Sequence, residues 1–213
     1  AVMSGVGYAS DPKRFAFSYL TGFAWGITLA LGGLFFVILQ HITRSGWSVV
    51  VRRVAEHLMT SLPVFALLWV PIWVFRETLY PWATHEGAAS HAVHAKAAYL
   101  NVPFWTGRAV FFFAVWSFIA YRLAKLSRDQ DSSGDPGLTL KMEGFSFPAL
   151  ALFGLTSSFG VGIDWMMSLE PGWYSTIFGV WIFSGAVVSM FAFLNVFFAR
   201  AQAAGLFKQV KQD

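Results

Sequence analysis

The sequence predicts an all-α protein, a polytopic transmembrane helical bundle that forms a single domain over residues 1–213. Of its residues, 56% are hydrophobic and only 12% are charged, whereas a soluble domain usually has about 25% charged residues. Aromatic residues reach 18%, as expected for side chains that face lipid and its interface. These proportions leave too little charge for an ordinary solvated surface.

Five apolar runs are long enough to cross a bilayer, which takes about 20 residues of helix. The runs are continuous and lack the period-two alternation that marks β-barrel strands. The predicted spans cover residues of about 15–40, 58–80, 104–123, 144–163 and 173–199. Pro63 and Pro71 in the second span, and Pro103 before the third, predict kinks or loosened helix ends.

Four links join these spans. Within residues 41–57, the segment Trp47–His57 is a candidate for a short helix that lies flat on the membrane. The link 76–103 is the longest, and the link 124–143 is rich in Asp, Ser and Gly, which predicts a solvated loop. The fourth link, 164–172, carries two carboxylates between two long apolar runs.

Lys and Arg are unequally shared between the two ends of the spans. Side A, where residue 1 lies, holds five: Lys13, Arg14, Arg76, Lys96 and Arg108. Side B holds ten: Arg44, Arg52, Arg53, Arg122, Lys125, Arg128, Lys141, Arg200, Lys208 and Lys211. The positive-inside rule then predicts that side B, with the residue-213 end, is cytoplasmic and that side A is outside.

Small residues recur four positions apart in two of the spans. They are Gly22 and Gly26, and then Gly154, Ser158 and Gly162. Small residues at this spacing let helix backbones approach closely, so these positions are expected to lie in helix contacts.

Asp164 and Glu170 are the main candidates for chemistry. On a helix, Asp164 falls near the line of Gly160 and Ser157, which predicts that it faces the bundle. An ionisable residue in a membrane is costly unless it is paired or hydrated, so it marks a functional site by default. The alternative is a carboxylate at the outer interface, either solvated or capping the turn into Pro171.

Two basic residues are candidate partners. Arg108, just inside the third span, either pairs with one of these carboxylates or extends to the interface. His41, at the side B end of the first span, either relays protons or anchors the interface. Carboxylates in buried, aromatic surroundings, such as those near Trp165 and Tyr174, exchange protons near neutral pH.

Several classes of site are not predicted. The chain has no Cys, which excludes disulfides, thiolate-bound iron–sulfur clusters and c-type haem attachment in this chain. No span contains a mid-span His pair for haem. His91 and His94 are three residues apart but lack a third ligand, so no metal site is expected. The basic residues are spread over several loops, so nucleic acid is not an expected partner.

The stretch 164–179 reads DWMMSLEPGWYSTIFG and resembles a signature of the F-type large membrane subunits of bacterial alternative complex III. These subunits belong to the NrfD-like, or polysulfide-reductase membrane-subunit, superfamily. Further stretches agree over most of the chain: 11–20, 46–53, 79–82 and 96–103. The sequence departs from the pattern at Gly172, where a His commonly follows the Pro.

The resemblance implies a bacterial inner-membrane protein of about ten spans in total, with one before Ala1 and several after Asp213. Its complex is a quinol:cytochrome c oxidoreductase. The implied partners are a paralogous quinol-binding membrane subunit, an iron–sulfur subunit, multihaem cytochrome c subunits, small membrane subunits and lipids. Haem and iron–sulfur clusters would lie in those partners, while this chain would contain no redox centre and bind at most a quinone such as menaquinone.

The leading hypothesis is a membrane subunit that provides a proton path and a possible quinol-binding surface. Asp164 and Glu170 would carry protons on the outer side, with Arg108 as their charge partner and His41 as the inner relay. The quinol candidates are Trp165 and Tyr174. The alternatives are a structural scaffold that anchors the catalytic subunits and a secondary transporter, although the spans lack the mid-membrane ionisable cluster typical of transporters.

Overall fold

The computed structural model describes residue 7 and residues 11–206. Over these residues it is helical without strands, at 82% helix, which confirms the predicted fold class. Five helices are long and apolar enough to cross a membrane. They are Pro12–Ile42, Val49–Val74, Val102–Ser133, Gly137–Leu169 and Phe178–Ala203. Lys208 and Lys211, counted on side B, lie outside the described residues.

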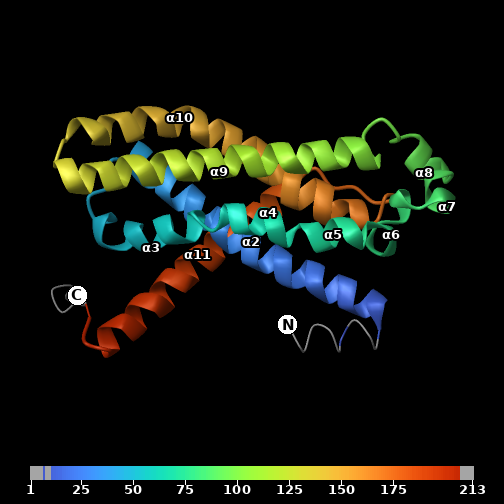
Figure 1. Ribbon diagram of the computed structural model, residues 1–213, viewed down its shortest axis with the longest axis horizontal. Coiled ribbons are helices and arrows are strands. Elements are labelled where there is room, and N and C mark those ends of the chain that lie inside the picture. Colours follow the sequence, from blue (N-terminus) through green and yellow to red (C-terminus); the bar gives the residue numbers. More distant parts are fainter. Residues whose placement is uncertain (1–6, 8–10, 207–213) are drawn as a thin grey trace.

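Successive long helices run in opposite directions, so the two ends of the bundle correspond to sides A and B (Figure 1). The long elements are α2 (Pro12–Ile42), α3 (Val49–Met59), α9 (Val102–Ser133), α10 (Gly137–Ser157) and α11 (Phe178–Ala203). The short ones are α4 (Leu62–Leu68), α5 (Val70–Val74), α6 (Arg76–Leu79), η1 (Pro81–Ala83), α7 (His85–Ala88), α8 (His91–His94), η2 (Ser158–Met166) and η3 (Met167–Leu169).

In Figure 1, side A is at the right, where α6, α7 and α8 lie, and side B is at the left. Helices α9 and α10 form a long hairpin, and α2 crosses the bundle beneath it. The last helix, α11, diverges from the bundle towards its C-terminal end. The largest fully buried side chains include Trp105, Trp116 and Trp165, so the core on side A is built from aromatic rings.

The prolines break the second span as predicted. Pro63 lies in the first turn of α4 and Pro71 in the first turn of α5, positions where the missing N–H costs no helical hydrogen bond. The short helix predicted within Trp47–His57 is present as α3. It packs against α2, where a Cβ on Gly33 would lie 3.1 Å from the Ala55 carbonyl oxygen, and Val49–Val74 together are long and apolar enough to form one candidate span.

The predicted solvated loop at 124–143 is wrong. Helix α9 continues to Ser133 and ends at Gly134, whose φ of 67° is left-handed, and α10 already begins at Gly137. The side B end of α9 still buries Leu126 and Ser127. Its polar residues occupy the exposed face of a helix, so their composition resembles that of a loop.

The fourth span also extends past its predicted end at residue 163. After Ser157 the helix widens into the π-helix η2 and tightens into η3, so the chain stays helical through Leu169. Asp164 is therefore inside this helix, whereas the sequence predicted it in a link. The physical reason is that neighbouring side chains satisfy both its carboxylate and its carbonyl oxygen, as shown below.

The small-residue prediction holds at three of its five positions. A Cβ on Gly162 would lie 2.8 Å from the Cα of Gly179, and Gly179 itself packs on Ser158. A Cβ on Gly26 would lie 2.9 Å from the ring of Phe65. By contrast, a Cβ on Gly22 or Gly154 would meet nothing within 4 Å. Close packing therefore fixes η2 against the start of α11.

Candidate functional site

Asp164 is fully buried, with 0% of its surface exposed, and its carboxylate has three hydrogen-bond donors. Arg108 donates from Nε to Oδ2 at 2.7 Å and from Nη2 to Oδ1 at 3.1 Å. The Tyr99 hydroxyl donates to Oδ1 at 2.7 Å. A two-pronged guanidinium contact is the strong geometry for a carboxylate. Of the two alternatives for Arg108, the structure shows pairing.

The backbone around Asp164 is held by side chains from other elements. In a π-helix the usual carbonyl pairing is interrupted, so freed backbone groups need other partners. The indole of Trp105 donates to the Asp164 carbonyl oxygen at 3.0 Å, and the Ser168 hydroxyl donates to the same oxygen at 2.6 Å. Further contacts are Tyr80 to the Trp165 carbonyl oxygen and Trp82 to the Ser168 carbonyl oxygen.

Arg108 is positioned by the start of α9. The Asn101 side chain accepts a hydrogen bond from the N–H of Phe104 at 2.9 Å and caps the helix. The guanidinium then lies over two rings, 3.8 Å from the centroid of Tyr99 and 4.4 Å from that of Phe104. It also donates to the Tyr99 carbonyl oxygen at 3.0 Å. These contacts hold the charge of Arg108 beside Asp164.

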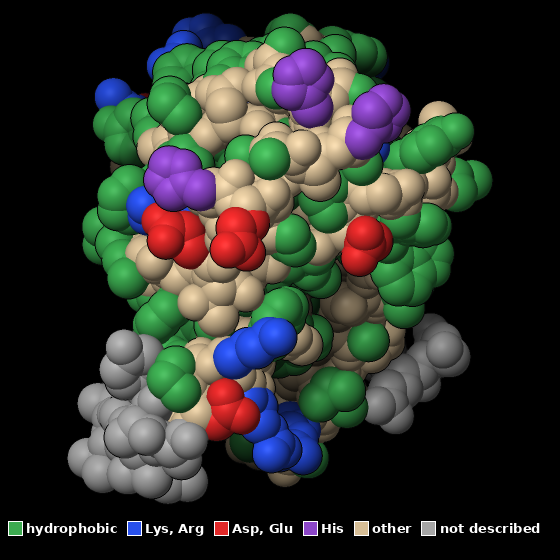
Figure 2. All heavy atoms as spheres, turned by 90° about the vertical axis from the view of Figure 1, so that its right-hand side faces the viewer, with side chains coloured by type: hydrophobic (Ala, Val, Ile, Leu, Met, Phe, Trp, Pro, Cys, Tyr) green, Lys and Arg blue, Asp and Glu red, His purple; other side chains and the backbone are tan. Residues whose placement is uncertain are grey.

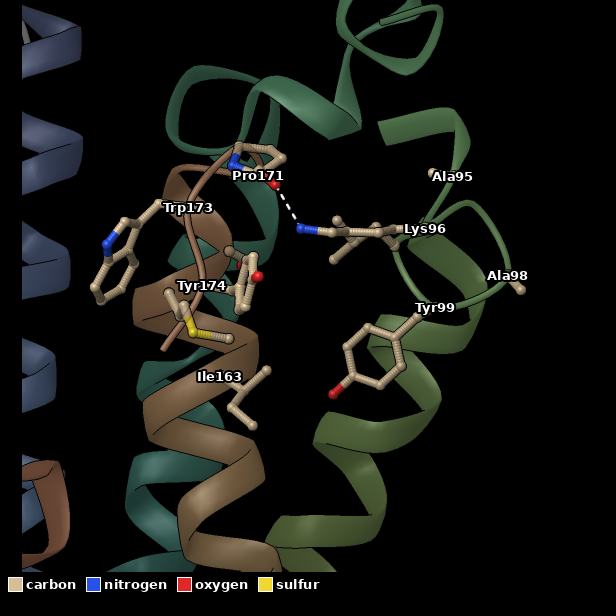
Figure 3. A pocket seen from close by; sticks show the side chains of 11 residues that line it. Ala95, Lys96, Ala98, Tyr99, Ile163, Pro171, Trp173 and Tyr174 are labelled. Carbon is tan, nitrogen blue, oxygen red and sulfur yellow. Dashed lines mark hydrogen bonds between the residues drawn. The ribbon is translucent and has the colours of Figure 1, made fainter. Parts of the chain in front are cut away.

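A cavity of about 460 Å³ opens beside this cluster, between the segment after α8 and the end of η2 (Figure 3). Its walls are mainly apolar and include Ile163, Met167, Trp173 and Tyr174. Tyr99 lines the cavity and also contacts Asp164. It therefore connects the cavity to a carboxylate that is otherwise shut off from solvent.

The polar groups of the cavity are few. The Lys96 ammonium donates to the Pro171 carbonyl oxygen at 2.6 Å and lies 5.9 Å from the ring centroid of Tyr174. Burial, and then the neighbouring Asp164 carboxylate, raise the pKa of Tyr99 above its ordinary value. The Tyr99 hydroxyl is therefore protonated at neutral pH and serves as a hydrogen-bond donor to Asp164.

The two predicted carboxylates lie in different surroundings. Glu170 is exposed, beyond the end of η3. A Cβ on Gly172 would lie 3.4 Å from Glu170 Oε1, an ordinary contact, so the local backbone leaves room for a side chain there. The structure therefore does not bring Asp164 and Glu170 into one paired site.

The remaining predicted residues are divided between the site and the core. Tyr174 lines the cavity, but Trp165 does not. The ring of Trp165 stacks on Phe113 at a centroid distance of 5.4 Å and is 1% exposed. His41 is buried at the side B end of α2, and its Nε2 has no hydrogen-bond partner among the described residues. The length of α2 separates His41 from the side A cluster.

Sequence reasoning missed three members of the site: Tyr99, Lys96 and Trp173. A signal for the first two was available, because the stretch 96–103 leads directly into the span that carries Arg108. Their contacts with η2 depend on the fold of the long link, which composition alone does not predict.

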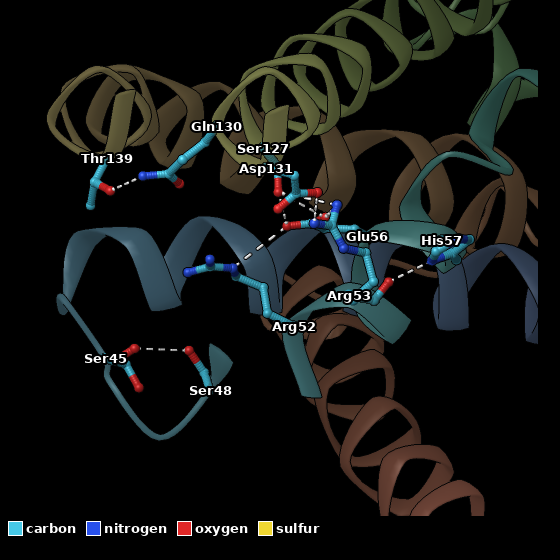
Figure 4. A network of polar contacts seen from close by, with 10 residues as sticks. All are labelled: Ser45, Ser48, Arg52, Arg53, Glu56, His57, Ser127, Gln130, Asp131 and Thr139. Atoms are coloured by element: carbon cyan, nitrogen blue, oxygen red, sulfur yellow. Dashed lines mark hydrogen bonds and ion pairs between the residues drawn. The ribbon is translucent and has the colours of Figure 1, made fainter. Parts of the chain in front are cut away.

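Side B contains a second buried carboxylate, Glu56 on α3, which is 4% exposed (Figure 4). Arg53 donates to it at 2.8 Å, and the Ser127 hydroxyl lies 2.9 Å from Oε1. Arg52 is 3.5 Å away, and Arg53 also pairs with Asp131. This network ties α3 to α9.

Figure 2 looks onto side A, where histidine and acidic side chains lie at the surface. His85, His91 and His94 are exposed. Within the described residues, no group of three or more His, Asp or Glu side chains is placed to hold a metal ion.

No protein-family model matches the chain, and no curated protein matches its sequence.

Proposed function

We propose that this chain is an integral membrane subunit of a quinol-oxidising respiratory complex, with the Asp164 cluster and its cavity as a quinol-binding surface. The observation that carries the proposal is the double position of Tyr99, whose side chain lines the apolar cavity and donates to the buried carboxylate. The resemblance of residues 164–179 to the F-type subunits of alternative complex III supports the same function.

The cavity suits a quinol in size and chemistry. Small-molecule sites typically occupy about 300–1,000 Å³ and combine apolar walls with a few placed polar groups. Trp173 and Tyr174 provide aromatic surface for a flat ring. The oxygen of Tyr99 keeps lone pairs that can accept a hydrogen bond from a quinol hydroxyl while its own proton bonds Asp164.

The proposed role of the cluster is to receive protons. A proton from the quinol hydroxyl passes to the Tyr99 oxygen as the Tyr99 proton moves to Asp164 Oδ1. Arg108 keeps the carboxylate ionised and oriented before the transfer. Glu170, exposed at the same end, is a proposed exit for protons to water. Electrons would leave to the redox centres of partner subunits.

The direct test is Asp164→Asn in the assembled complex. The amide keeps the shape of the side chain and one acceptor oxygen but cannot take up a proton. We expect quinol-dependent turnover to fall about 100-fold or more, the scale of a lost general base, while co-purification of partners is unchanged. Turnover equal to wild type would contradict the proposal.

One observation favours a scaffold as the second candidate function. The apolar window of α11 is only 17% buried, and it exposes Trp181 at 66% and Val188 at 68%. Such a face suits lipid or another helix of a complex. Full activity in an Asp164→Asn, Glu170→Gln double variant, with partners retained, would support the scaffold and remove the proton role.

We also propose that side B is cytoplasmic in a bacterial inner membrane, on the strength of its excess of Lys and Arg. Ser133 is exposed at the side B end of α9, and a Ser133→Cys variant gives the chain its only thiol. We expect a membrane-impermeant maleimide to label it only after the membrane is opened. Ready labelling in intact cells would reverse the topology.

A further inference from the structure

A small cavity of about 70 Å³ opens between α3 and α9 on side B, remote from the proposed quinol site. Its lining is mostly charged or polar: Arg53, Glu56, His57, Thr60, Ala124 and Arg128. The close-up in Figure 4 shows Arg53 and Glu56 on α3 meeting Ser127 and Asp131 of α9, with His57 apart from them and hydrogen-bonded to the Arg53 carbonyl oxygen.

The one carboxylate in this lining is already neutralised. Glu56 receives Arg53 at 2.8 Å and the Ser127 hydroxyl at 2.9 Å, and Arg52 lies 3.5 Å away. Arg53 also pairs with Asp131. The exposed side chain of Arg128, by contrast, has no hydrogen bond or ion pair to any of the described residues. The N–H donors of its guanidinium are therefore available to a ligand in the cavity.

The surroundings carry a positive excess. Helix α3 and the side B end of α9 hold five basic residues: Arg52, Arg53, Arg122, Lys125 and Arg128. They hold three acidic residues: Glu56, Asp129 and Asp131. The difference is two positive charges (five minus three), with His57 not counted. Guanidinium groups match the oxygens of a phosphate in pairs, so the ligand expected here is a phosphate group.

Exposed apolar side chains continue from this cavity along α4, which follows α3, and along α9. Val64 and Leu67 follow Thr60 by four and seven residues and are 54% and 72% exposed. Tyr121 precedes Arg128 by seven residues, two helical turns, and is 60% exposed. The cavity therefore lies at the boundary between the charged side B ends of the helices and an exposed apolar surface of the kind that faces lipid. Basic pockets between membrane helices at such a boundary suit lipid headgroups.

We propose that this cavity binds the phosphate of an anionic phospholipid, whose acyl chains lie along the exposed apolar side chains of α4 and α9. The alternative source of the same chemistry is free inorganic phosphate, which would need the arginines but not the apolar surface. The proposal does not depend on the quinol function, because it rests on residues at the opposite end of the bundle.

The test is lipid binding by the full chain in a neutral detergent, measured by native mass spectrometry with added phosphatidylglycerol or phosphatidylcholine. We expect tighter binding of phosphatidylglycerol, weakened about fivefold by Arg128→Gln, the effect of one basic residue at a membrane surface. Arg200→Gln on α11 makes the same charge change outside the cavity and is expected to leave binding unchanged.

The melting temperature of each variant without lipid checks that it is folded, and Arg128 has no described partner whose loss would unfold the chain. Equal affinity for the two lipids, or equal weakening by Arg128→Gln and Arg200→Gln, would overturn the proposal. Inorganic phosphate that displaces phosphatidylglycerol at millimolar concentration would overturn the assignment to lipid.

Discussion

Among the described residues, two carboxylates are buried, one at each end of the bundle, and similar side chains surround them. Asp164 on side A is held by Arg108 and the Tyr99 hydroxyl. Glu56 on side B is held by Arg53 and the Ser127 hydroxyl. The Arg108–Asp164 pair joins α9 to η2, whereas Arg53 and Glu56 both lie on α3 and reach α9 through Ser127 and Asp131.

The two sites differ in what their partners face. Tyr99 opens onto an apolar cavity of about 460 Å³, whereas the Glu56 network borders a charged cavity of about 70 Å³. Arg108 has 10% of its side chain exposed, and Arg53 has 39%. A buried ion pair is therefore insufficient to identify a site for a small apolar substrate. The cavity that borders each ion pair, apolar on side A and charged on side B, distinguishes the two sites.

The largest effect is expected for Arg108→Ala. It leaves the Asp164 carboxylate fully buried without its cation, and breaking a buried pair in this way typically costs about 3–5 kcal/mol. Chemical unfolding in detergent, followed by circular dichroism, measures the change. Arg122→Ala on the same helix is the matched control, because Arg122 is exposed and its side chain has no hydrogen bond or ion pair to the described residues. An equal loss in both variants would show that Asp164 does not depend on Arg108.

Glu56→Gln should cost less, about 1.5–3 kcal/mol, the scale of a hydrogen bond to a charged group. Arg53 keeps its ion pair with Asp131 and has 39% of its side chain exposed, so no cation is left buried without a partner. The same unfolding assay compares the two ends directly. A loss larger than that of Arg108→Ala would reverse the proposed ranking of the two carboxylates.

Gly162→Ala tests the packing that places η2. Its new Cβ would lie 2.8 Å from the Cα of Gly179, and overpacking of this kind costs about 1–3 kcal/mol. Gly154→Ala lies in the same continuous helix but meets nothing within 4 Å, so it should be neutral or raise stability by up to about 1 kcal/mol. Similar melting temperatures for both variants would contradict the close contact.

Tyr99→Phe removes one hydrogen bond to a charged group and should cost about 1.5–3 kcal/mol, less than Arg108→Ala. Asp164 keeps both donors from Arg108, and the ring of Phe retains the cation–π contact. A decrease in the free energy of unfolding above about 3 kcal/mol, the upper limit for an unsatisfied buried group, would mean that the main role of Tyr99 is structural.

The sequence was sufficient for the class of the fold and for the central carboxylate. Continuous apolar runs predicted the helices, and helical spacing correctly placed Asp164 on the buried side with Gly160 and Ser157. Composition failed at residues 124–143, because the exposed face of a helix and a loop use the same polar residues. The role of Tyr99, in the link 76–103, was not predicted, because its contact with η2 joins residues that are far apart in the sequence.

Side B was underestimated for a related reason. Glu56 stands among basic residues in the sequence and resembles ordinary loop charge, yet it is buried because α3 packs against α2 and α9. Trp165 shows the converse error. Its position next to Asp164 suggested contact with a ligand, but successive helical residues point in different directions, and its ring fills the core.

The most direct test of the central claim is binding of a short-chain naphthoquinol to the full chain in detergent under anaerobic conditions, measured by calorimetric titration. If Tyr99 accepts a hydrogen bond from the quinol, Tyr99→Phe should weaken binding about fivefold to tenfold, the scale of one hydrogen bond. Tyr121→Phe, an exposed tyrosine elsewhere on α9, should bind as wild type does. Unchanged affinity in Tyr99→Phe, or equal losses in both variants, would contradict the account.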